Sequence, residues 1–156
     1  MAALITLLGF DPGGKRIGVA VGQTLTNTAN PLGTIAVKHD VPDWNAIDHM
    51  INTWEPDGLV VGLPLNMDGT EQAMTLVARR FRSQLTHRYQ LPVYVADERL
   101  STREARDRLA YEGKLHEEDD SIAAQIILET WLDETATQQN WSIPPFTRFD
   151  GNESSD

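Results

Sequence analysis

Two apolar runs joined by a glycine-containing turn, LLGFDPGGKRIGVAVG at residues 7–22, constrain the fold more than any other part of the chain. The runs LITLLGF and RIGVAVG have the length and composition of strands, and DPGGK between them has the residues of a tight turn. The pair therefore predicts a hairpin at the start of the domain. It also puts one carboxylate, Asp11, at the point where the first strand ends.

The rest of the chain alternates between strand-like and helix-like patterns. Further strands are predicted at 30–38, 57–65 and 91–97, and helices at 41–54, 68–89, 101–113 and 119–136. Three strands with short connections, followed by units that alternate helix and strand, predict an α/β fold. We expect a mixed five-stranded sheet, with an antiparallel three-strand meander and two parallel strands, flanked by helices. Residues 1–136 form this domain, and the polar segment 137–156 is predicted to be a flexible tail.

Composition excludes several kinds of protein. The 156 residues include no cysteine, which excludes disulfides and thiolate metal sites. No stretch approaches the roughly 20 apolar residues of a membrane span. The apolar N-terminus also lacks the basic segment and the cleavage site of a signal peptide. We therefore expect a cytoplasmic protein with no membrane partner.

The charge distribution changes what the net charge implies. A net charge of −10 argues at first against nucleic-acid binding. Residues 79–108, however, hold eight Arg and four acidic residues, whereas 117–156 hold ten acidic residues and one Arg. The basic middle segment makes Arg79 and Arg80 candidates for contacts with nucleic-acid phosphates. Ordinary solvated helix faces remain the alternative for each Arg.

A phosphate-binding loop is the first alternative for the segment around Asp11. GFDPGGK matches most of the G-x-x-x-x-G-K pattern, but Arg16 stands where Ser or Thr should hold Mg²⁺. A strand-like run also follows where that motif requires a helix. The chain therefore lacks both the chemistry and the structural context of such a loop.

Three stretches bring acidic residues to the ends of predicted elements. Asp11 ends the first strand, Asp97 and Glu98 end the fifth, and Asp119 and Asp120 begin the last helix. Carboxylates that meet at one place on a sheet can hold hard cations such as Mg²⁺ or Mn²⁺, and paired ions can catalyse phosphodiester hydrolysis. The alternatives are structural: Asp before Pro-Gly is common in turns, and acids favour a helix N-terminus.

Helical spacing separates the two late acids. At 100° per residue, Asp120 lies in line with Ala124 and Ile127, so it is predicted to face the sheet. The proposed acids also have cations beside them in sequence, as phosphate binding requires. These are Lys15, Arg16 and Arg99.

Four segments together resemble the YqgF/RuvX family. They are FDPGGKRIGVAVG, VVGLPLNMDGTEQ, DERLSTREA and DSIAAQIILETWL, in that order, and the resemblance runs from about residue 4 to 134. The family consists of small bacterial proteins with an RNase H-like fold. They are assigned as pre-16S rRNA nucleases and were earlier assigned as Holliday junction resolvases. The resemblance does not cover the tail.

The resemblance implies a set of site residues. The three acids of the family fall on Asp11, Glu98 and Asp120, which would be both catalytic and metal-binding, and its loop after the fourth strand puts Asn66 and Gly69 near the substrate backbone. The chain departs from the family at Gly14, where Thr is frequent. Many RNase H-like nucleases also take an acid from the fourth strand, which here ends GLPLN without one, so Glu98 would have to act from one strand further across.

Three classes of function follow from these observations. The first is a nuclease that depends on Mg²⁺ or Mn²⁺ and matures the 5′ end of pre-16S rRNA, acting on structured RNA or a ribosomal precursor particle. The second is a resolvase of branched DNA, which should be a homodimer because a four-way junction presents two symmetric cuts. The third is a regulator that binds nucleotides or nucleic acid without catalysis. The sequence leaves monomer and homodimer open.

Overall fold

The computed structural model describes residues 5–24, 26–98 and 120–138. The described strands are β1 Thr6–Pro12, β2 Arg16–Gln23, β3 Thr28–Lys38, β4 Val41–Pro42, β5 Gly58–Leu63 and β6 Val93–Asp97. The described helices are α1 Trp44–Trp54, α2 Ala73–Tyr89 and α4 Asp120–Gln138. The helix predicted at 101–113 lies outside the described residues, as does most of the predicted tail.

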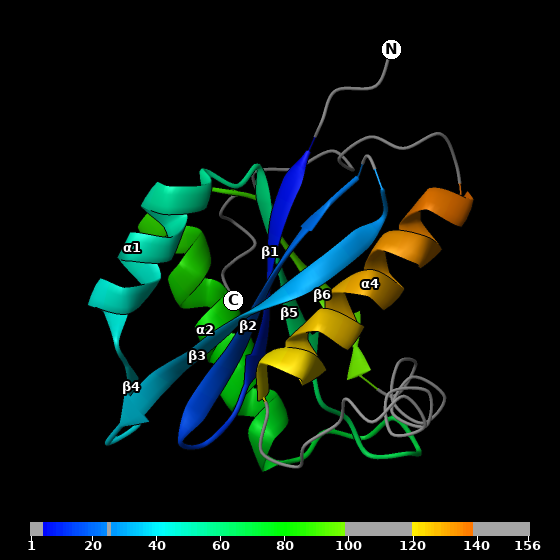
Figure 1. Cartoon of the computed structure of the whole chain (residues 1–156). Coiled ribbons are helices and arrows are strands. Elements are labelled where there is room, and N and C mark those ends of the chain that lie inside the picture. The colour runs from blue at the N-terminus through cyan, green and yellow to red at the C-terminus, as the bar shows by residue number, and fades with distance from the viewer. Residues whose placement is uncertain (1–4, 25, 99–119, 139–156) are drawn as a thin grey trace.

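The sheet has the strand order β4-β3-β2-β1-β5-β6. Neighbouring strands from β4 to β1 are antiparallel, whereas β1, β5 and β6 run parallel to one another. The predicted meander and the two parallel strands are therefore confirmed. The first strand, β1, lies at the centre and is paired on both edges, so its carboxyl end is the place where the two halves of the sheet meet (Figure 1).

Two boundaries differ from the prediction for local reasons. A two-residue strand, β4, adds a sixth strand at the edge of the sheet, where the prediction had started a helix at residue 41. The helix α1 begins only at Trp44, because the side chain of Asp43 caps it by accepting a hydrogen bond from the N–H of Ala46 at 3.3 Å. A strand of two residues is too short to show a periodic pattern.

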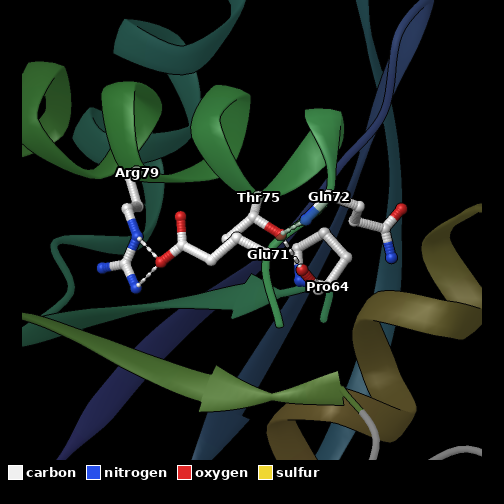
Figure 2. A network of polar contacts seen from close by, with 5 residues as sticks. All are labelled: Pro64, Glu71, Gln72, Thr75 and Arg79. Atoms are coloured by element: carbon white, nitrogen blue, oxygen red, sulfur yellow. Dashed lines mark hydrogen bonds and ion pairs between the residues drawn. The ribbon is translucent and has the colours of Figure 1, made fainter. Parts of the chain in front are cut away.

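The helix α2 begins at Ala73 rather than at 68, because the preceding residues form a closed loop. Thr75 is fully buried and joins this loop to the helix (Figure 2). Its hydroxyl accepts a hydrogen bond from the N–H of Gln72 at 2.9 Å and donates one to the carbonyl of Pro64. The end of β5 is thereby fixed to the first turn of α2.

The two faces of the sheet carry different side chains. The face covered by α1 and α2 is packed with large apolar residues, among them Phe10, Ile47 and Phe81. The face covered by α4 has a smaller core that includes Ala20, Ala124 and Leu128. Figure 1 shows α1 and α2 on one side of the sheet and α4 on the other. Small side chains on the second face let α4 lie close to the strands.

Within the described ranges, no helix is both long enough and apolar enough to cross a membrane.

Candidate active site

Asp11 lies near the carboxyl end of β1 on the face of the sheet that α4 covers. Leu8 and Phe10 belong to the core under α1 and α2, whereas Leu7 belongs to the core under α4. Because side chains alternate along a strand, Asp11 shares the α4 face with Leu7. In the antiparallel register of β1 and β2, its partner is Gly18.

The helix α4 approaches the strands closely at Gly18. A Cβ atom placed on Gly18 would lie 1.9 Å from the carbonyl oxygen of Asp120 and 3.0 Å from its Cβ. Only a glycine leaves room for the first residue of α4 at this point. Because Gly18 is the partner of Asp11, the close packing brings Asp120 and Asp11 to the same end of the sheet.

Glu98 directly follows β6, and its side chain lies on the same face of the sheet. A Cβ atom on Gly62 would lie 2.7 Å from Oε2 of Glu98 and 2.8 Å from Cδ1 of Ile127 on α4. Gly62 belongs to β5 and follows Val61, the register partner of Phe10. The carboxylate of Glu98 therefore lies over β5, between its own strand and β1. A glycine on the intervening strand lets this side chain extend toward Asp11.

Asp120 forms an ion pair with Arg16, the first residue of β2. Nε of Arg16 donates a hydrogen bond to Oδ2 of Asp120 at 2.8 Å. The two side chains are 48% and 32% exposed, so the pair lies at the surface rather than in the core. A cation that the sequence predicted to bind phosphate thus lies on one of the predicted metal ligands.

The three acids lie on one face of the sheet, but their side chains do not converge on one point. Among the described residues, no group of three His, Cys, Asp or Glu side chains is close enough together to hold a metal ion. The oxygen chemistry of Asp11, Glu98 and Asp120 suits Mg²⁺ or Mn²⁺. Their arrangement, with Asp120 held by Arg16, does not match a ready three-ligand site.

Three of the residues predicted to contact substrate form hydrogen bonds with other residues of the chain. Asn66 closes the loop before α2. Its side-chain Nδ2 donates to the hydroxyl of Thr70 at 2.9 Å, and its main-chain carbonyl accepts from the N–H of Gly69 at 2.8 Å. Gly69 has a φ of 91°, a conformation that favours glycine. Arg79 donates to Oε2 of Glu71 from Nε at 3.0 Å and from Nη2 at 2.6 Å (Figure 2).

The other predicted cations have different surroundings. Lys15 is exposed in the β1–β2 turn, one residue before β2 begins. Arg80 lies on α2 and lines a pocket of about 220 Å³ together with Gly13 and Gly14 of the same turn. Cations thus flank this turn on both faces of the sheet. Arg99 lies outside the described residues.

Gly18 and Gly62 are the site residues that sequence reasoning missed. Both are glycines inside strands, a position that weakens a strand and often marks close approach by another part of the chain. That signal was present, because Gly18, Ala20 and Gly22 are two residues apart and so share a face. It predicts an element packed tightly on β2, though not which one.

Comparisons with known proteins agree with this architecture. A family model described as "RuvX: Holliday junction resolvase" matches residues 5–134. A protein of Pseudomonas fluorescens (strain SBW25) is 49% identical over 137 residues, which cover 85% of this chain and 94% of that protein. A protein of Legionella pneumophila (strain Philadelphia 1) is 53% identical over 132 residues, covering 82% and 95%. Both carry the name "Putative pre-16S rRNA nuclease".

Solved structures extend the comparison to the fold. The structure of RuvC from Thermus thermophilus in complex with a Holliday junction substrate has a TM-score of 0.54 and 15% sequence identity. The match covers 85% of this chain and 96% of that one. A second Thermus thermophilus RuvC structure gives a TM-score of 0.52 at 13% identity. The predicted RNase H-like fold is therefore confirmed.

Proposed function

The chain belongs to the RuvX family, and on that premise we propose that it is a nuclease that hydrolyses phosphodiester bonds during maturation of the 5′ end of pre-16S rRNA. The names of relatives about half identical over most of the chain support this choice of substrate. We place it in the cytoplasm, with residues 1–136 as the nuclease domain and 137–156 as a tail.

The position of three acids on one face of the sheet is the observation that carries the proposal. We assign Asp11, Glu98 and Asp120 as the catalytic carboxylates and as the ligands of a divalent cation, Mg²⁺ or Mn²⁺. Such a cation supplies Lewis-acid activation of water and of the phosphate. The glycines at 18 and 62 support the assignment, since each leaves the space that one of the later acids occupies.

The cations around the β1–β2 turn are assigned to the phosphates of the substrate. Lys15, Arg16 and Arg99 would contact phosphates beside the acids, and Arg80 would extend the contact around the turn. Arg79 would add positive charge to the surface that binds substrate, although its guanidinium is paired with Glu71. Asn66 and Gly69 act indirectly, because their hydrogen bonds fix the loop that precedes α2.

Holliday junction resolution is the second candidate, favoured by the description of the family model and by the fold shared with RuvC. Purified protein with Mg²⁺ or Mn²⁺ should be given a labelled pre-16S rRNA 5′ segment and, separately, a synthetic four-way junction. We expect cleavage of the RNA by the parent and none by Asp11→Asn. Cleavage of the junction alone, by a dimer, would replace the first proposal with the second. Stabilisation by ATP without any cleavage would favour a regulator.

A further inference from the structure

The ion pair between Arg16 and Asp120 joins the two parts of the chain that form the acid site. Arg16 is the first residue of β2, directly after the turn between β1 and β2, and Asp120 is the first residue of α4. The residues are 104 positions apart in the sequence, and their side chains meet at 2.8 Å. The pair therefore forms only when α4 is docked on the sheet.

The charges nearby give the pair a physical reason. Asp11 and Asp120 lie at the same end of the sheet, where two like charges repel each other. A guanidinium always carries its charge, so Arg16 neutralises part of this repulsion whatever the pH. Its side chain is about half exposed, and a solvated pair of this kind is weak enough to be exchanged.

We infer that Arg16 is the counter-ion of Asp120 in the metal-free protein, and that a divalent cation displaces it. The inference rests on the proposed function, in which Asp120 is a metal ligand. It accounts for the absence, among the described side chains, of a group of three acids ready to hold a metal. Once released, the guanidinium of Arg16 has the fork geometry that binds a phosphate oxygen pair. Arg16 would thus pair with Asp120 before the metal binds and contact the substrate afterwards.

The exchange can be observed directly on the arginine side chains. Nε of Arg16 and Nε of Arg88 each donate to a carboxylate, at 2.8 Å and 3.0 Å, so the second is an internal control far from the acids. In ¹⁵N-labelled protein titrated with Mg²⁺, we expect the Nε–H signal of Arg16 to shift or exchange faster, and that of Arg88 to stay constant. An unchanged Arg16 signal while the metal raises the melting temperature would overturn the inference.

A pair of matched variants gives a second test. Arg16→Met removes the competing cation, whereas Arg88→Met removes an ion pair of the same type between α1 and α2. The Mn²⁺ concentration at half-maximal stabilisation should fall about two- to fivefold in Arg16→Met, the range expected for a surface ion pair. It should match the parent in Arg88→Met.

The outcomes separate this inference from the function on which it rests. A Mn²⁺ midpoint in Arg16→Met equal to that of the parent overturns the exchange but leaves the metal site intact. No stabilisation by Mn²⁺ in any of the three proteins removes the metal site, and with it both the exchange and the metal-dependent part of the proposed function. A lower midpoint in both variants would show a general effect of charge and would also overturn the exchange.

Discussion

The two faces of the sheet differ in the size of the side chains that they carry. Under α1 and α2, large side chains such as Phe10 and Phe81 meet edge to face, with ring centroids 5.5 Å apart. Under α4, glycines at 18 and 62 leave gaps that are filled by the main chain of the helix and by an acid. The first face buries the larger side chains, whereas the second combines a smaller apolar core with glycines that lie beside charged groups. We therefore expect substitutions on the two faces to differ in their effects on stability and on the proposed chemistry.

The polar contacts follow the same division. On the first side, Asp48 of α1 accepts hydrogen bonds from Arg88 at 2.9 and 3.0 Å and from the hydroxyl of Tyr89 at 2.5 Å. The guanidinium of Arg88 also lies 5.0 Å from the ring centre of Trp44. This cluster fastens α1 to α2 and lies away from the acid site. On the second side, the ion pair of Arg16 and Asp120 lies within the proposed acid site.

The largest expected effect on stability comes from the first face. Leu85 of α2 is fully buried, so Leu85→Ala should lower the free energy of unfolding by about 2–5 kcal/mol. Cleavage per folded molecule should stay within a few-fold of the parent. Urea unfolding and activity normalised to the folded fraction measure the two effects. Leu76→Ala on the same helix is the control, since Leu76 is 59% exposed and should change stability by no more than about 0.5 kcal/mol.

A change on the second face should damage both properties. Gly18→Ala sets a Cβ against the main chain of Asp120, which cannot move without shifting α4. We expect a cost of about 1–3 kcal/mol and a loss of cleavage on the order of 100-fold, because the acids are displaced. Gly14→Ala is the matched control, since its Cβ would meet nothing within 4 Å. Full activity in Gly18→Ala would mean that the position of Asp120 does not matter for cleavage.

Asp120→Asn should separate chemistry from stability. It removes the charge proposed to bind metal, so most metal-dependent cleavage should be lost. It also weakens the ion pair with Arg16 while relieving repulsion with Asp11, so metal-free stability should change by less than about 1 kcal/mol. Single-turnover cleavage and metal-free melting curves test both points. Asp119→Asn, outside the described residues, should stay within a few-fold of the parent, and a larger loss there would reverse the assignment.

The smallest effect concerns pH and the first face. Hydrogen bonds from Arg88 and then Tyr89 lower the pKa of Asp48 from its ordinary value of 3.8 to about 2. A depressed pKa in the folded state means that the carboxylate stabilises the fold fully above about pH 4 and loses this contribution as the pH falls toward 2. The melting temperatures of the parent and Asp48→Asn should therefore converge as the pH is lowered across this window. A constant difference would show that the ionised form of Asp48 contributes nothing specific.

The sequence predicts those parts of the molecule that depend on local pattern. The hairpin around Asp11 follows from two apolar runs and the turn between them, and the parallel strands from the alternation of helix and strand patterns. The inward face of Asp120 follows from the helical period of 3.6 residues, and the structure agrees with each. The start of α2 was predicted too early because the loop before it is held by contacts with Pro64 and Thr70, which leave no periodic signal.

The contact between Arg16 and Asp120 could not be predicted in the same way. The residues are separated by 104 positions, and a single sequence carries no pattern that pairs one Arg among many with one acid among many. The reach of Glu98 across β5 likewise depends on Gly62, a residue whose role is visible only once both neighbours are placed on it. Tertiary contacts of this kind are fixed by the packing of whole elements.

The docking of α4 onto β2 also bears on when, during folding, Asp120 can meet Asp11. The hairpin of β1 and β2 closes over a few residues and can form early, whereas α4 meets it only after a loop of about a hundred residues has closed. We therefore expect Asp120 to join Asp11 late in folding. During synthesis the helix also leaves the ribosome after every strand that the structure describes. On this order, the proposed set of acids would be complete only after the sheet has been built.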